Sequence, residues 1–183
     1  MEDYILQVKN LKTYFYMDNG TLKAVDDVSF NLRRDETIGI IGESGCGKSV
    51  TASSILRIIQ NPGKTLAGEI LFNNGEKEVN LVEYGPDSKE MRSIRGQDIS
   101  MIFQEPMASL APVYTIGAQM MEAVMVHQKK KDKKAAKELC MEMLREVGMP
   151  DPEQKFKSYP HQLSGGQCQR AMIALAMVNR PKI

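Results

Sequence analysis

The fold is decided by one stretch of the sequence, Gly42-Glu43-Ser44-Gly45-Cys46-Gly47-Lys48-Ser49. It fits the G-x-x-x-x-G-K-[ST] pattern of a phosphate-binding loop and follows the short apolar run Ile38–Ile41. Glycines let backbone N–H groups turn toward a polyphosphate, where Cβ atoms would obstruct them. Lys48 supplies a cation for the β- and γ-phosphates, and the Ser49 hydroxyl suits Mg²⁺. The stretch therefore predicts a buried strand followed by a phosphate cradle.

A chance match by a Gly/Ser-rich turn is the alternative reading of this stretch. Because glycine makes up about 7% of residues in proteins, such a match arises in well under roughly one chain in a hundred of this length. The residues after the loop also form one apolar helical face: Ala52, Ile55, Leu56 and Ile59. The motif and its surroundings together favour nucleotide phosphate binding.

The composition is that of an ordinary globular domain. The 183 residues are 42% hydrophobic and 26% charged, with a net charge of +1, which gives no indication of a nucleic-acid partner. No apolar run approaches the ~18 residues of a membrane span, and no signal pattern opens the chain, so any membrane role is expected to be peripheral. Three widely spaced cysteines form no disulfide or zinc pattern, which favours a reducing compartment.

The N-terminal half predicts mostly β structure. Alternating apolar residues predict antiparallel strands within residues 4–32, joined by a turn at Asp18–Gly20. We expect a loop over Gly63–Gly68, and further strands at Glu69–Phe72 and Asp98–Gln104. The aromatic cluster before the turn has two readings, a strand surface or a platform for a nucleotide base: Tyr14, Phe15 and Tyr16.

The C-terminal half predicts helices. Apolar periodicity places them at Ile116–His127 and Ala135–Val147, within a helical insertion that covers residues 107–160. The lysine-rich run Lys129–Lys134 is either a solvated helix start or a patch for an anionic surface.

A second anion-binding element precedes the last predicted helix. Ser164 is a good N-cap, and Gly165 and Gly166 expose amides at the helix start. Alone, such a sequence is most often only a helix cap. Its pairing with a phosphate loop more than a hundred residues upstream favours a functional role.

Three motifs in order resemble those of ABC ATPases. Gly42–Ser49 looks like Walker A, Gln104 at the end of a predicted strand like the Q-loop, and Leu163–Gln167 like the signature motif. The stretches Lys23–Phe30 and Met101–Met107 are similar to the ATP-binding subunits of oligopeptide/dipeptide and nickel importers. The resemblance covers essentially the whole chain.

The resemblance implies roles for individual residues. Phe15, with Tyr14 as the alternative, would stack on adenine, and Val25 would pack beside the base. Lys48 and Gln104 would act in catalysis, and Ser49 and Gln104 would bind Mg²⁺. The nucleotide ATP would be held by Gly42, Glu43, Ser44, Gly45, Cys46, Gly47, Lys48, Ser49 and Val50. The γ-phosphate of ATP on a second copy would be met by Leu163, Ser164, Gly165, Gly166 and Gln167.

The implied fold class is α/β: a P-loop NTPase core of ABC type with an N-terminal antiparallel β layer and an inserted helical subdomain. Residues 1–183 would be a partial ABC ATPase domain, divided into the β layer and P-loop core at 1–106, the helical subdomain at 107–160 and the signature segment at 161–183. The C-terminal part of the core, with the Walker B aspartate and the catalytic glutamate, is expected to lie beyond Ile183.

The implied function is ATP-driven peptide import at the cytoplasmic face of the cell membrane. The implied partners are a second ATPase subunit, identical or related, the transmembrane permease subunits and, indirectly, an extracytoplasmic solute-binding protein. Two alternatives stay open: a truncated nucleotide-binding module without hydrolysis, and a soluble ABC ATPase of translation or DNA repair. Departures from the importer pattern loosen the substrate class: Cys46, Ala108, Ala111 and Gln167-Cys168.

Overall fold

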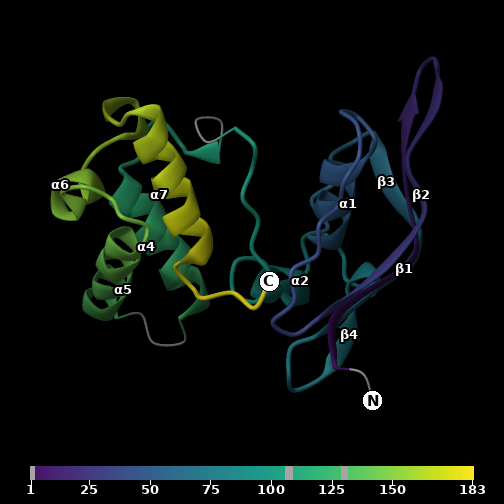
Figure 1. The fold of residues 1–183 in the computed structure, drawn as a ribbon, viewed down its shortest axis with the longest axis horizontal. Helices are drawn as coiled ribbons and strands as arrows, with labels where there is room; N and C mark the ends of the chain where they lie inside the picture. Colours follow the sequence, from purple (N-terminus) through teal and green to yellow (C-terminus); the bar gives the residue numbers. More distant parts are fainter. Residues whose placement is uncertain (1–2, 106–108, 129–131) are drawn as a thin grey trace. The chain divides into compact units, whose positions relative to one another are not determined.

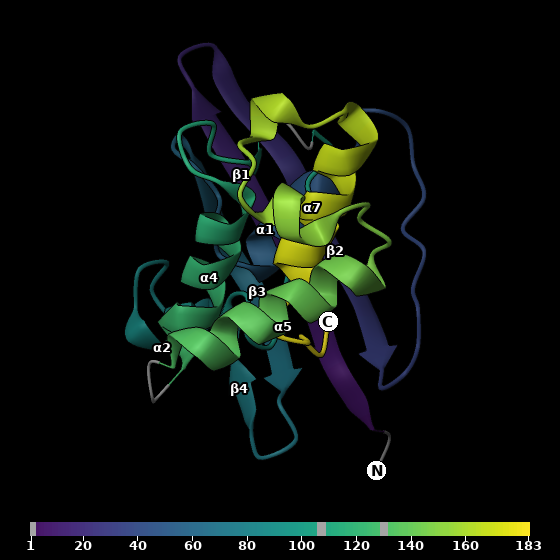
Figure 2. The ribbon, with the colours of Figure 1, turned by 90° about the vertical axis from the view of Figure 1, so that its left-hand side faces the viewer.

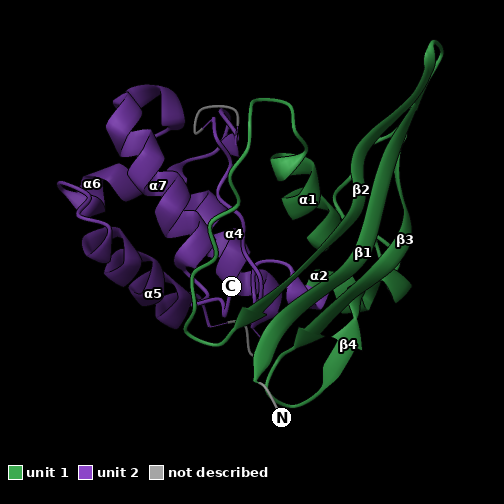
Figure 3. Ribbon diagram, turned by 45° about the vertical axis from the view of Figure 1, so that its right-hand side comes forward, with its two compact units in different colours: residues 1–92 green, residues 93–183 purple. Residues whose placement is uncertain are grey.

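The computed structural model describes residues 3–105, 109–128 and 132–183. They form two compact units, residues 1–92 and residues 93–183, which are coloured separately in Figure 3. The first contains the sheet and the phosphate loop, and the second contains the helices that lead to the signature segment.

The first unit is built on a four-stranded antiparallel sheet with the order β2-β1-β3-β4 (Figure 1). The long strands β1 (Tyr4–Met17) and β2 (Gly20–Arg33) form a hairpin, as the alternating pattern and the Asp18–Gly20 turn predict. Strand β3 (Gly63–Asn73) pairs with β1, and the short β4 (Glu78–Asn80) pairs with the end of β3.

The hairpin is irregular in its middle. Leu6 and Val8 point to the buried face, and the next buried residues on β1 are Leu11 and Thr13, so the alternation changes phase between them. Asn10 on β1 and Asp27 on β2 have left-handed φ values of 49° and 63°. These bulges decide which residues of the later half of β1 face inward.

Helix α1 (Lys48–Ile55) packs on the buried face of the sheet. The hydroxyls of Thr13 on β1 and Ser54 on α1 lie 2.8 Å apart, and both residues are buried. Because neither hydroxyl reaches water, this hydrogen bond satisfies polar atoms that would otherwise destabilise the fold. The unit continues through η1 (Leu81–Glu83) to α2 (Lys89–Ile94), which crosses into the second unit.

The second unit packs α4 (Ile116–His127), α5 (Lys133–Glu146) and α7 (Gly165–Met177) against one another (Figure 2). The short α6 (Pro152–Phe156) and η2 (Pro160–Gln162) connect α5 to α7. Thr115 caps α4 by accepting the Ala118 amide, and Asp132 caps α5 in the same way. Both caps explain why the helices begin close to where the sequence predicts them.

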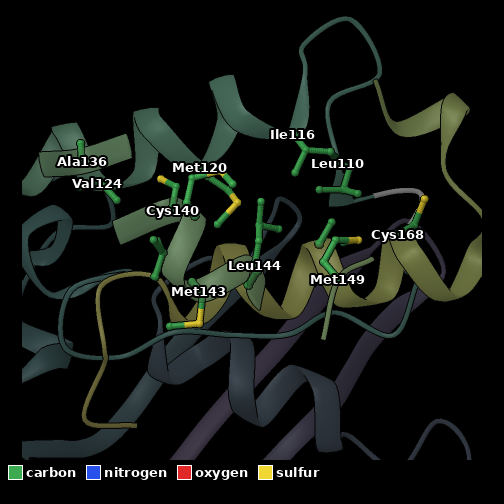
Figure 4. Close-up of a cluster of buried hydrophobic side chains, with 14 residues drawn as sticks. Leu110, Ile116, Met120, Val124, Ala136, Cys140, Met143, Leu144, Met149 and Cys168 are labelled. Carbon is green, nitrogen blue, oxygen red and sulfur yellow. The ribbon is translucent and has the colours of Figure 1, made fainter. Parts of the chain in front are cut away.

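The helices enclose a core rich in methionine and cysteine. Figure 4 shows its buried side chains converging from these helices and the loops between them: Leu110, Ile116, Met120, Val124, Ala136, Cys140, Met143, Leu144, Met149 and Cys168. Within the described ranges, no helix is long and apolar enough to cross a membrane.

Two predicted strands are wrong. Ile38–Ile41 forms no strand, and Ile41 is 97% exposed. Asp98–Gln104 forms no strand either, because Asp98 lies in a turn and Ile99 takes part only in an isolated bridge to Arg95. Ile38–Ile41 has no neighbouring strand among the described residues to accept and donate its backbone hydrogen bonds. Asp98–Gln104 does bond to a neighbouring stretch at its start, where the Ser100 amide donates to the Ile183 carbonyl and the Asp98 carbonyl accepts the Lys182 and Ile183 amides, but no strand forms there.

The Gly63–Gly68 segment is not a loop, because it is the first half of β3. It pairs with β1 from Gly63 opposite Phe15 to Ala67 opposite Lys12. The two glycines suggested a loop, but the ladder to β1 overrides that local preference.

Some predictions lie outside the described residues. They are Pro106, Met107 and Ala108 of the importer-like stretch, and Lys129–Lys131 of the lysine run. The domain boundaries at 106/107 and 160/161 stay a prediction.

We predict that Gly117→Ala destabilises the helical unit. Gly117 is buried in α4, and a Cβ there would overlap the ring of Phe156 on α6. Overpacking of this kind costs about 1–3 kcal/mol, against a helix-propensity gain of about 1 kcal/mol. Thermal unfolding followed by circular dichroism should show a lower Tm.

Gly85→Ala is the matched control, because the nearest atom to its new Cβ is the Ser88 Cβ at 4.0 Å. Equal Tm values for the two variants would contradict the contact between Gly117 and Phe156.

Candidate nucleotide site

The phosphate loop closes against strand β2. Gly47 has φ +94°, the left-handed value that ends the loop and caps α1, and a Cβ at this position would overlap the carbonyl oxygen of Ala24. Gly45 also has a left-handed φ, +83°. Both positions therefore need glycine, the first for close approach as well as for conformation.

The Lys48 ammonium lies inside the loop. Its Nζ donates to the carbonyl oxygens of Gly42 and Glu43, each at 2.7 Å, and lies 3.4 Å from the Cys46 sulfur. These acceptors are neutral. Phosphate oxygens accept stronger, charge-assisted bonds, so the ammonium is placed to exchange the carbonyls for a polyphosphate.

The start of α1 adds further donors. The first intrahelical bond of α1 runs from the Thr51 amide to the Gly47 carbonyl at 2.8 Å, so the amides of Lys48, Ser49 and Val50 have no acceptor within the helix. The first turn carries no acidic residue, and its dipole is positive at this end. The exposed Ser49 hydroxyl is a hard oxygen donor of the kind Mg²⁺ accepts. The residues present thus fit a polyphosphate with a magnesium ion.

Two residues that the resemblance assigns to the base lie on the same hairpin. Val25 is buried, and its Cγ2 lies 3.8 Å from the place where a Cβ of Gly47 would be, directly beside the loop. Phe15 is half-buried in β1, and its ring packs over Gly63, where a Cβ would lie 2.6 Å from the Phe15 Cε1. One side of the ring is therefore supported by protein.

Tyr14, the alternative stacking residue, is engaged elsewhere. Its hydroxyl donates to Asp26 Oδ1 at 2.6 Å, and the Lys23 ammonium lies 5.4 Å from its ring centre. The bond to Asp26 raises the pKa of Tyr14 to about 12, from 10.0. Because the folded-state pKa is raised, this bond stabilises the fold fully below pH 10 and is lost as the pH rises toward 12.

The signature segment in the second unit is held by a helix cap. Ser164 and Gln167 form a reciprocal capping box at the start of α7, with hydrogen bonds of 3.1 and 3.4 Å, and Leu163 packs against the helical core. Gly165 and Gly166 are exposed, and a Cβ on either would meet no atom within 4 Å. No contact within the described chain requires glycine at these two positions.

Gln104 is exposed in the second unit. It lines a hollow of about 460 Å³ with Phe103, Glu105 and Ser109. The structure therefore brings Val25 to the phosphate loop in the first unit, whereas Gln104 and the signature segment belong to the second unit.

Sequence reasoning overlooked Asp26, which binds Tyr14. The available signal was the pair Asp26-Asp27 within a predicted strand, because aspartate is disfavoured in strands and marks an irregularity. It also overlooked the Ala24 carbonyl, which side-chain patterns do not reveal.

Solved ABC transporter cassettes share this architecture. The dimeric structure of MJ0796, a bacterial ABC transporter cassette, matches with a TM-score of 0.82 and 25% identity over 96% of this chain and 70% of that chain. A second structure of that cassette, in a post-hydrolysis state bound to ADP and Pi, matches equally. The described sheet, loop and helices are therefore part of a P-loop core of ABC type.

Curated relatives agree with the resemblance seen in the motifs. The dipeptide transport ATP-binding protein DppD of Bacillus subtilis is 48% identical over 98% of this chain and 52% of its own length. The probable peptide ABC transporter ATP-binding protein y4tR of Sinorhizobium fredii is 46% identical over 99% of this chain and 52% of its own. The chain thus spans about half the length of these relatives. Residues 25–183 match the ABC transporter family, and the chain belongs to it.

Proposed function

We propose that this chain binds ATP as part of the ATP-binding subunit of an ABC importer for peptides. The observation that carries the proposal is the Gly42–Ser49 loop, with its ammonium at the centre and three helix amides without an intrahelical acceptor at its end. The names of the peptide and dipeptide relatives support the substrate class.

Each residue of the loop has a distinct role in this proposal. Lys48 neutralises the β- and γ-phosphates, and the amides of Lys48 to Val50 donate to the phosphate oxygens. Ser49 would hold Mg²⁺, which supplies charge neutralisation when bound, and Gln104 would contribute a second oxygen to it. Phe15 and Val25 would contact the base.

The signature glycines would serve a second ATPase subunit. Gly165 and Gly166 are exposed without an internal packing reason, and the α7 start that follows Ser164 presents amides to an anion. We therefore assign them to the γ-phosphate of ATP on the partner's loop. The dimeric form of the similar cassette supports such a pairing.

A loop in the second unit supports docking to permease subunits at the cytoplasmic face of the membrane. Val113 and Tyr114 are 72% and 59% exposed. Gln119 holds this loop: its Oε1 accepts the Ala111 amide at 2.9 Å, and its Nε2 donates to the carbonyls of Ala111 and Tyr114. An ordered apolar surface of this kind suits a protein partner. The solute-binding protein would act through the permease.

Lys48→Ala should lower ATP affinity by about 10- to 150-fold, the effect of losing hydrogen bonds to a charged group. The fold should persist, because Lys48 bonds only to neighbouring atoms of its own loop. Calorimetric titration and circular dichroism measure the two quantities. Lys77→Ala, at an exposed position of the same unit, is the control. Unaltered ATP affinity in Lys48→Ala would sink the assignment of the loop.

ATP should protect Cys46 from alkylation. Cys46 is the exposed thiol, whereas Cys140 and Cys168 are buried, and burial raises the pKa of Cys140 to about 11. Mass spectrometry after brief alkylation should find Cys46 modified without ATP and spared with it. Protection should disappear in Lys48→Ala. Equal labelling with and without ATP would show that the nucleotide does not occupy the loop.

A polypeptide of residues 1–183 should bind ATP without turning it over. The resemblance places the Walker B aspartate and the catalytic glutamate after residue 183, and water activation depends on such groups. Phosphate release with Mg²⁺ should equal the background rate of Lys48→Ala. Turnover above that background would mean that these 183 residues supply the missing carboxylate themselves.

A further inference from the structure

We propose that Asp26 is a positioning residue that holds the base platform, Phe15, in register with the phosphate loop. The inference rests on the proposed function, since it assumes that Phe15 contacts the base of ATP. Asp26 lies on β2 between Val25, beside the loop, and Asp27, the left-handed residue of the bulge.

The pairing of β1 with β2 is irregular just before Phe15, so contacts that hold the register of β1 matter for the position of Phe15. The pairing of β1 with β2 shifts between Val8 and Leu11, again between Leu11 and Thr13, and again between Thr13 and Tyr14. Because side chains alternate between faces, a slip by one residue would turn every later side chain of β1 to the opposite face. Phe15 would then leave the face on which Val25 and the loop lie.

Two carboxylates tie the strands across this irregular region: Asp27 accepts the Asn10 Nδ2 at 3.0 Å at the bulge, and Asp26 holds the part of β1 that follows. Asp26 accepts the Tyr14 hydroxyl at 2.6 Å, and its oxygens lie 3.9 Å from the Lys12 Nζ and 3.6 Å from the Lys23 Nζ. Lys12 and Tyr14 flank Thr13, which is buried on the other face against α1. The contacts on the outer face therefore fix the register in which Thr13 and Phe15 face inward.

Asp26 also links the strand that carries Phe15 to the strand that contacts the phosphate loop. The two residues before Asp26, Ala24 and Val25, are those that Gly47 approaches most closely. Because Asp26 follows these two residues and accepts the Tyr14 hydroxyl, it fixes the position of β1, and of Phe15 on β1, relative to the phosphate loop. The cluster thereby sets the spacing between the base and the phosphates of one nucleotide.

The test compares ATP with inorganic tripolyphosphate, which lacks the nucleoside. Stacking of a base on an aromatic ring strengthens binding by about 5- to 140-fold, so the unaltered chain should prefer ATP to that extent. Both affinities are measured by calorimetric titration of the 183-residue chain at one Mg²⁺ concentration. Phe15→Ala, which removes the platform itself, should abolish most of the preference.

Tyr14→Phe removes one hydroxyl and should reduce the preference by about 2- to 12-fold, with tripolyphosphate affinity unchanged. Asp26→Ala should reduce the preference for ATP over tripolyphosphate at least as much as Tyr14→Phe does. Asp26→Asn should reduce this preference less than Asp26→Ala, because the asparagine oxygen can still accept the Tyr14 hydroxyl. Asp27→Asn is the control, because it removes the same charge and asparagine tolerates the left-handed φ.

An unchanged preference in Tyr14→Phe and Asp26→Ala would overturn the inference and leave the proposed function standing. A parallel loss of both affinities in Tyr14→Phe would also overturn it, because a loosened fold weakens both ligands. An unaltered chain that binds tripolyphosphate as well as ATP would instead refute the base platform, and the inference with it.

Discussion

The backbone of Gly47 touches the carbonyl of Ala24, and no side chain fits between them. This approach joins the loop at the start of α1 to strand β2. The buried hydrogen bond between Thr13 and Ser54 then anchors α1 to β1, and β1 in turn pairs with β3. Helix α1 is thus held on the sheet at both ends: by the backbone contact of Gly47 at its start and by the Ser54 hydroxyl near its end. These two contacts fix the direction in which the amides at the start of α1 point.

In the second unit, the exposed motif is held by a helix cap and not by a close contact between backbones. This signature segment has its helix cap at Ser164, and Leu163 beside that cap packs against a core rich in methionine. Methionine fills irregular space between helices without demanding one geometry. The glycines at the tip need no internal partner, so the segment is both firmly held and open to another molecule.

The sequence predicted local features well where one segment decides its own structure. The Asp18–Gly20 turn, the Ser164 cap of α7 and the glycines of the loop follow from short-range chemistry. Ile38–Ile41 was mispredicted because a strand needs a neighbouring strand, which an apolar run does not supply by itself. Asp98–Gln104 was mispredicted because its backbone bonds to Lys182 and Ile183 are confined to its first residues. The bulge at Asn10 and Asp27 was missed for a related reason, since its left-handed residues are ordinary in composition and become visible only in the pairing of two strands. Asp26 belongs to that bulge, and no motif marks it.

Gln119 has a consequence for the thermodynamics of assembly. A loop that orders only when it meets a partner loses conformational entropy at that moment, and association is weakened accordingly. The side-chain amide of Gln119, which accepts one hydrogen bond and donates two, already restricts the loop of Val113 and Tyr114 in the free chain. Any partner that covers these two side chains meets a surface whose shape is set beforehand, so removal of apolar area from water can contribute to affinity with little ordering cost.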